Sequence, residues 1–78
     1  MQEIKITMKD RILKYMQDFG SITTREAMYD LGCSDLQHYI MVLREEYFIN
    51  DKWLTDKNRW GEPVRYKRYW IEYKYGVE

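Results

Sequence analysis

Apolar positions in the first half of the chain recur every three or four residues, which is the period of an α-helix. Between residues 8 and 19 they fall at 8, 12, 15, 16 and 19, so they share one face. Thr7 precedes this stretch and Asp10 follows three positions later, which is the spacing of a capping box. Gly20 then provides a favoured helix stop. The pattern predicts a first helix over about residues 8–19.

A second capping box and a second glycine stop follow within the next twelve residues. Thr23 and Glu26 have capping-box spacing ahead of an apolar stripe at positions 27, 28 and 31, and Gly32 follows as a stop. We therefore expect a second helix over about residues 24–31.

A third helical stretch begins after a very short gap. Ser34 and Gln37 have capping spacing, and apolar positions at 36, 40, 43 and 47 continue at intervals of four, three and four. This predicts a helix over about residues 35–46. Only Gly32-Cys33-Ser34 separates it from the second helix, and such a tight connection is typical of a helix-turn-helix.

Beyond residue 47 the pattern changes to one typical of β-strands. Residues 48–49, 52–55 and 64–73 are rich in β-branched and aromatic side chains, with Asn50-Asp51 as a break. A turn over residues 60–63 contains a glycine that tolerates positive φ. We expect a hairpin over about residues 52–73. Three helices followed by a hairpin predict a single α+β domain with the winged helix-turn-helix fold.

Two stretches carry a family resemblance. FGSITTREAMYDLGCSDLQHYIMVLREEYFI, followed by RWGEPVRYKRYWI, resembles the small helix-turn-helix domain proteins of phages and prophages over about residues 10–71. The resemblance implies a winged-helix fold and DNA binding, often in regulatory roles. Asp35 and Tyr39 stand where members of that family often carry basic residues.

Charge is distributed unevenly along a chain whose formal net charge is zero. Residues 1–51 contain six Lys/Arg and nine Asp/Glu, a net of −3, whereas residues 52–74 contain seven and three, a net of +4. A basic hairpin interleaved with aromatic rings suits contact with a phosphate backbone. The alternative is that these cations only keep an edge hairpin soluble. Those nearest the turn are Lys57, Arg59, Arg65, Lys67 and Arg68.

The third helix supplies the other candidate surface. If positions 36, 40 and 43 are buried, a rotation of about 100° per residue places His38, Met41, Val42 and Glu45 on the opposite side. Glutamine can pair with adenine, arginine with guanine or phosphate, and an apolar group with the thymine methyl. The alternative is a solvated helix face. From this helix we select Gln37, His38, Met41 and Arg44 as DNA-binding candidates, beside the five hairpin cations.

Residues for catalysis or metal binding are scarce. Cys33 and His38 are the only cysteine and the only histidine, their spacing fits no zinc motif, and one cysteine cannot form a disulfide within the chain. The sequence has no Gly-rich phosphate loop and no nucleophile–histidine pair. We therefore expect no enzyme, metal or cofactor. No apolar run approaches 18 residues and no signal peptide is visible, so we expect a cytoplasmic protein with no membrane role.

These observations predict a small protein that binds double-stranded DNA. A transcriptional regulator or an excisionase-like architectural factor would fit, acting as a homodimer or as neighbouring copies on DNA. An alternative is a protein-interaction module on the same fold, such as a phage inhibitor of a host factor, because Tyr39, Met41 and Val42 are expected to be exposed on an acidic half. Self-association through Trp53 and Trp70 is a third hypothesis.

Overall fold

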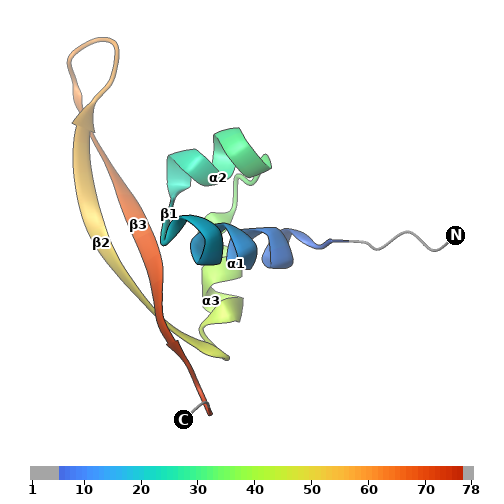
Figure 1. Cartoon of the computed structure of the whole chain (residues 1–78). Coiled ribbons are helices and arrows are strands. Elements are labelled where there is room, and N and C mark those ends of the chain that lie inside the picture. Colours follow the sequence, from blue (N-terminus) through green and yellow to red (C-terminus); the bar gives the residue numbers. More distant parts are fainter. Residues whose placement is uncertain (1–5, 77–78) are drawn as a thin grey trace, which may run out of the picture.

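The computed structural model describes residues 6–76, in which three helices lie against one side of a three-stranded antiparallel sheet (Figure 1). The short β1 pairs with β3, which also pairs with β2, so the strand order is β1-β3-β2. In chain order the elements are α1 (Met8–Phe19), β1 (Ile22–Thr23), α2 (Thr24–Leu31), α3 (Leu36–Leu43), β2 (Tyr47–Lys57) and β3 (Pro63–Lys74).

The ends of α1 follow the local sequence signals, but its last residue does not pack as expected. The Thr7 hydroxyl accepts a hydrogen bond from the Asp10 amide at 3.2 Å, and Gly20 ends the helix at φ +86°. Phe19 was expected on the buried face, yet it is 71% exposed and rests only 4.6 Å (ring centroids) from Tyr15. The helix ends at Gly20 in the left-handed conformation, and Ile22 of β1, which is fully buried, is the next side chain that packs in the core.

The second helix and the turn after it also form from local interactions. The Thr23 amide donates to Glu26 Oε1 at 2.9 Å, and the Glu26 amide donates to the Thr23 hydroxyl at 3.0 Å, which completes a capping box. Gly32 adopts φ +68° at the end of α2, and Cys33 packs in the core at 4% exposure. The turn therefore directs α3 across α2 with a small buried side chain at its centre.

The third helix is shorter than expected, and the Ser34–Gln37 cap is wrong. The N-cap is Asp35, which makes no side-chain capping hydrogen bond. The helix ends at Leu43 and not at residue 46, because the amides of Glu45 and Glu46 bond back only three residues and tighten the chain into a turn. This turn is needed because β2 begins at residue 47, where Tyr47 already pairs with Lys74.

The hairpin is longer than the 52–73 expected and has no break at Asn50-Asp51. Both residues pair with β3, opposite Trp70 and Tyr69. The irregularity lies instead next to Phe48, where Glu72 is the extra residue of a bulge between two successive pairs. Continuous pairing makes the two strands one twisted ribbon whose tip projects past the helices (Figure 1).

The core forms where the helices meet the inner face of the sheet. Tyr39 and Val42, expected to be exposed, are half-buried, and Tyr39 packs against the core. The centre of the sheet contributes Tyr69, which is 5% exposed and pairs with Ile22 of β1. The buried hydrophobic side chains of the core are Ile12, Met16, Ile22, Ala27, Cys33, Leu36, Ile40, Leu43, Ile49 and Tyr69.

Candidate nucleic-acid interface

The turn at the tip of the hairpin is held by one asparagine. Asn58 Oδ1 accepts hydrogen bonds from the amides of Trp60 (2.9 Å) and Glu62 (3.0 Å), and its own amide donates to the Glu62 carbonyl at 3.0 Å. Gly61 takes φ +77°. This closed loop holds out Arg59, which is exposed, and Trp60, which is 77% exposed. We call the hairpin β2–β3 with this turn the wing.

One face of the wing carries two cations stacked on a tryptophan. Alternate residues of a strand point to opposite faces, so Arg65, Lys67 and Tyr69 share the face that the helices cover. The Arg65 guanidinium lies 4.7 Å and the Lys67 ammonium 5.0 Å from the Trp53 ring centroid. Lys57 is exposed near the tip. The structure therefore brings four of the five hairpin candidates to the tip and inner face of the wing.

Arg68 lies on the opposite face of β3. Its Nη1 donates to the Ser21 hydroxyl at 2.7 Å, and its side chain is half-buried beside β1. This arginine joins the sheet to the segment before β1. The structure does not place it with the other wing cations.

Arg44 fastens the end of α3 to β2. Its guanidinium donates to the Ile49 carbonyl (3.3 and 3.1 Å) and to Asp51 Oδ2 at 2.7 Å, and it lies 6.0 Å from the Tyr69 ring centroid. These contacts hold its charge against β2. The side chain is still 41% exposed, but its guanidinium is engaged with β2.

The exposed side of α3 carries three of the four helix candidates. Gln37, His38 and Met41 are exposed, and Met41 reaches 62%. We call these three residues the reading face. A glutamine amide, an imidazole and a thioether can contact base edges or a thymine methyl, although none brings a fixed positive charge. Positive charge on this side of the molecule comes from the wing.

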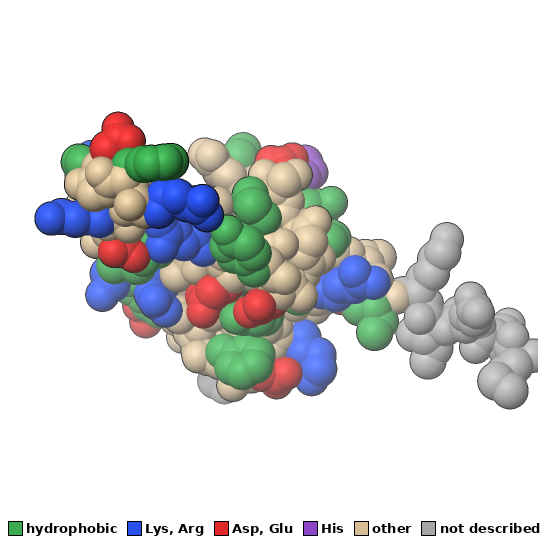
Figure 2. Space-filling view, turned by 90° about the horizontal axis from the view of Figure 1, so that it is seen from above, with side chains coloured by type: hydrophobic (Ala, Val, Ile, Leu, Met, Phe, Trp, Pro, Cys, Tyr) green, Lys and Arg blue, Asp and Glu red, His purple; other side chains and the backbone are tan. Residues whose placement is uncertain are grey.

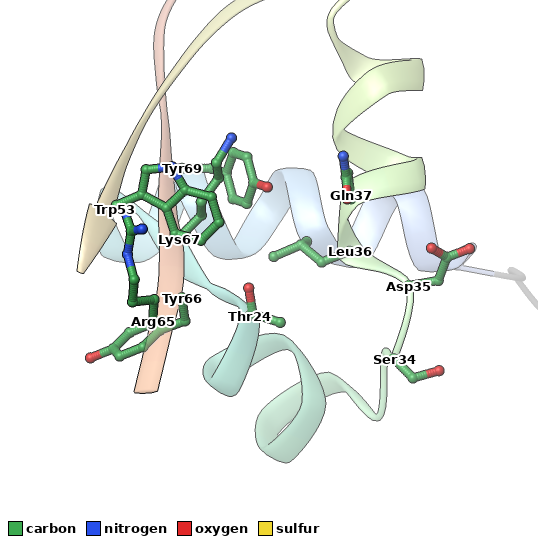
Figure 3. Close-up of a pocket in the computed structure, with 10 residues that line it drawn as sticks. All are labelled: Thr24, Ser34, Asp35, Leu36, Gln37, Trp53, Arg65, Tyr66, Lys67 and Tyr69. Atoms are coloured by element: carbon green, nitrogen blue, oxygen red, sulfur yellow. The ribbon is translucent and has the colours of Figure 1, made fainter. Parts of the chain in front are cut away.

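A hollow of about 340 Å³ separates the first turn of α3 from the wing. Figure 3 shows that one wall is the inner face of the wing and the other is the start of α3, with the Ser34 and Asp35 side chains directed away from it. The lining residues are Thr24, Ser34, Asp35, Leu36, Gln37, Trp53, Arg65, Tyr66, Lys67 and Tyr69.

The charge distribution on the surface follows the difference between the two halves of the sequence. Viewed toward the wing tip, Lys and Arg side chains gather over the hairpin, and a few acidic groups lie among them (Figure 2). The helical part on the same view carries scattered charges of both signs. The basic surface is therefore local to the wing.

Asp51 connects this basic surface to the fold. Its carboxylate is 2.7 Å from Arg44 Nη2 and 3.6 Å from Lys67 Nζ. The hydrogen bond from Arg44, aided by the charge of Lys67, holds the pKa of the Asp51 carboxyl below its usual range against the opposing effect of burial. The Asp51 carboxylate thus pairs with both Arg44 and Lys67, and the cluster of these three residues carries a net positive charge.

This lowered pKa predicts a loss of stability in acid. Below an unfolded-state pKa of about 3.9 the unfolded chain binds a proton that folded Asp51 resists, so the free energy of unfolding falls as the pH drops. Urea unfolding of the wild type and Asp51→Asn should show a stability gap that is widest near neutral pH and shrinks below about pH 4. A gap that stays constant down to pH 2.5 would contradict this role.

No metal centre appears within residues 6–76, where no three His, Cys, Asp or Glu side chains gather closely enough to hold an ion. Nor does this part of the chain contain a helix long and apolar enough to cross a membrane.

Three aromatic residues of this surface were not among the DNA-binding residues predicted from the sequence. Trp53 and Tyr69 line the hollow and Trp60 stands at the tip. Trp53 lies directly opposite Lys67, and that position depends on the exact register of the strands. The register could not be fixed from the sequence because the bulge at Glu72 shifts it by one residue. The location of Trp60 in the turn was a usable signal.

Comparison with protein families assigns the chain to a known family. A family described as "Winged helix-turn-helix domain" matches residues 7–73, which covers all six helices and strands except the end of β3. Proteins with this domain are typically DNA-binding and not enzymes. Comparison with curated proteins and with solved structures finds no match.

Proposed function

Because the chain belongs to the winged helix-turn-helix domain family, we propose that it binds double-stranded DNA with the reading face of α3 in the major groove and the wing along the backbone and neighbouring minor groove. The observation that carries this proposal is the joint position of the two surfaces. Gln37 and the inner-face cations Arg65 and Lys67 line the same hollow, so one duplex can contact both.

The two surfaces have different tasks in this proposal. Arg59, Arg65 and Lys67, with Lys57, supply positive charge for phosphates, which gives affinity and orientation but no sequence information. Gln37 and His38 supply hydrogen bonds to base edges, and Met41 supplies an apolar contact for a thymine methyl. Arg44 and Arg68 act within the fold and support the positions of α3 and β3.

The biological role that fits is a phage-type transcriptional regulator or an excisionase-like architectural factor. A single 78-residue module covers a short stretch of duplex, so two copies on neighbouring half-sites would raise both affinity and specificity. A homodimer or adjacent copies on DNA are therefore part of the proposal.

Fluorescence anisotropy with labelled mixed-sequence duplexes tests the function directly. At about 50 mM salt we expect saturable binding at micromolar protein or tighter, since even nonspecific binding reaches this range. Gln37→Ala should narrow the affinity difference between preferred and scrambled sites by roughly tenfold, because a good bidentate base contact is worth about 1–3 kcal/mol. Absence of binding at tens of micromolar protein would refute the proposal.

A protein-interaction module on the same fold is the second candidate. The observation that favours it is Met41, which is 62% exposed on α3, while Arg44 at the end of this helix is paired with Asp51. Apolar exposure of this kind is common in partner interfaces. The half-burial of Tyr39 and Val42 leaves a smaller apolar patch than the sequence indicated. The anisotropy titration distinguishes the two candidates, because only the first requires duplex DNA.

A further inference from the structure

The hollow between α3 and the wing contains a hydrogen-bond donor that the fold does not use. Tyr69 is 5% exposed, and within residues 6–76 no group forms a hydrogen bond with its hydroxyl. Figure 3 shows this hydroxyl pointing across the hollow toward the first turn of α3. Within the described residues, every buried side-chain oxygen or nitrogen that is fully shielded from solvent has a hydrogen-bond partner. Because the Tyr69 hydroxyl has no partner, it is not fully shielded and can be reached from the hollow. Hydroxyls of buried side chains normally form hydrogen bonds. Since this one forms none within the protein, it is available to bond with an incoming group.

The protonation state of Tyr69 makes it a donor. Burial raises the pKa of its hydroxyl, and the Asp51 charge adds to this effect against the opposing charge of Arg44. At neutral pH the group keeps its proton. It can therefore donate to an anion and not repel it.

The surroundings of this hydroxyl are suited to a negatively charged group. Lys67 and Arg44 share the single carboxylate of Asp51, so the pair leaves one positive charge over, and Arg65 adds another on the same wall. The opposite wall is the first turn of α3, which no side chain caps, so backbone N–H groups remain there. The acidic group nearest this turn, Asp35, points away (Figure 3).

The position of the hollow indicates which anion would reach it. In duplex DNA one sugar–phosphate strand separates a major groove from the adjacent minor groove. A protein that places α3 in the first groove and the wing tip in the second must have that strand pass between them. The hollow lies between α3 and the wing.

We propose that one phosphate of this strand docks in the hollow and accepts hydrogen bonds from the Tyr69 hydroxyl and the Lys67 ammonium. This inference rests on the DNA-binding function proposed above and names a contact within it. Such a contact carries no sequence information, but it fixes how deeply α3 enters the major groove. Tyr69 is thus both a core residue and a positioning residue for DNA.

Tyr69→Phe tests the contact because it removes only the unbonded hydroxyl and keeps the buried ring. We expect unchanged thermal unfolding and about a tenfold loss of duplex affinity, the usual effect of losing a hydrogen bond to a charged group. Tyr73→Phe is the matched control, since Tyr73 lies on the same strand, is 56% exposed and does not line the hollow. Its affinity for DNA should equal that of the wild type.

A methylphosphonate scan of the duplex locates the phosphate. For the wild type, one neutral substitution between the two grooves should reduce affinity by about tenfold, as Tyr69→Phe does. The same substitution should have little further effect on Tyr69→Phe, because the contact is already gone. Equal sensitivity of both proteins at every phosphate would overturn the assignment.

The remaining outcomes separate this contact from the proposed function. If Tyr69→Phe binds duplex DNA with wild-type affinity while substitutions of the wing arginines weaken binding, the phosphate contact in the hollow would be refuted. The proposed DNA-binding function would still stand. No binding by any variant would refute the function itself. Saturable binding of inorganic phosphate, followed by the Tyr69 and Gln37 amide signals in NMR spectra at constant ionic strength, combined with wild-type duplex affinity in Tyr69→Phe, would assign the hollow to a free anion and overturn the backbone assignment.

Discussion

Leu43→Ala is expected to destabilise the protein by about 2–5 kcal/mol, because it removes a fully buried side chain and leaves a cavity. For a domain of this size the whole free energy of unfolding is roughly 4–12 kcal/mol at 0.05–0.15 kcal/mol per residue. The substitution should therefore remove a large fraction of the total stability. Circular dichroism during heating and urea titration would measure the change, with an expected drop in Tm of about 10 °C or more.

The position of Leu43 explains why this site is so sensitive. It is the last residue of α3, it is 0% exposed, and the next residue is the arginine that bonds to β2. A cavity there loosens the junction between α3 and the wing. Met41→Ala, two residues earlier and 62% exposed, is the matched control and should stay within about 0.5 kcal/mol of the wild type. A similar effect for both variants would contradict the burial of Leu43 in the core.

The affinity for duplex DNA is expected to fall about a hundredfold or more between 50 and 200 mM salt if four wing cations each neutralise a phosphate. Each contact adds about 0.9 to the slope of log affinity against log salt. Arg59→Ala/Arg65→Ala removes two of the four cations, so it should lower the slope by about 1.8 and reduce the salt-induced loss to roughly tenfold. Anisotropy titrations at several salt concentrations give both slopes.

A control of equal charge is available on the same hairpin. Lys52 points to the opposite face of β2 from Trp53, and Lys74 lies at the far end of β3, 5.7 Å from the Tyr47 ring centroid. Lys52→Ala/Lys74→Ala should keep the wild-type slope. If this pair lowers the slope as much as the arginine pair, net charge and not the wing would govern binding.

Sequence patterns correctly predicted those features that depend on contacts between residues close together in the chain. Thr7 and Thr23 cap α1 and α2 through groups three positions away, and Gly20 and Gly32 take the left-handed conformation that ends each helix. The hairpin turn follows the same rule at Gly61. Such contacts are independent of the rest of the fold, so the sequence predicts them directly.

The end and the cap of the third helix could not be predicted from local sequence patterns. Its periodicity continues to Tyr47, yet the helix ends at Leu43 because pairing of Tyr47 with Lys74 begins the sheet. Strand pairing between residues 27 positions apart outweighs a marginal last turn of helix. The Ser34–Gln37 spacing likewise gave no cap, since Asp35 occupies the N-cap and its side chain makes no bond.

The sequence by itself therefore determined the order of the three helices and the hairpin, the caps of α1 and α2, the turn and the concentration of basic residues in the hairpin. Tertiary structure alone decided which contacts the candidate arginines and lysines make. It turned Arg44 toward Asp51 and Arg68 toward Ser21, and it left Arg65 and Lys67 beside Trp53. It also placed the Tyr69 hydroxyl at an open hollow. The physical reason is that these contacts join residues far apart in the chain, and their geometry depends on strand register and helix packing.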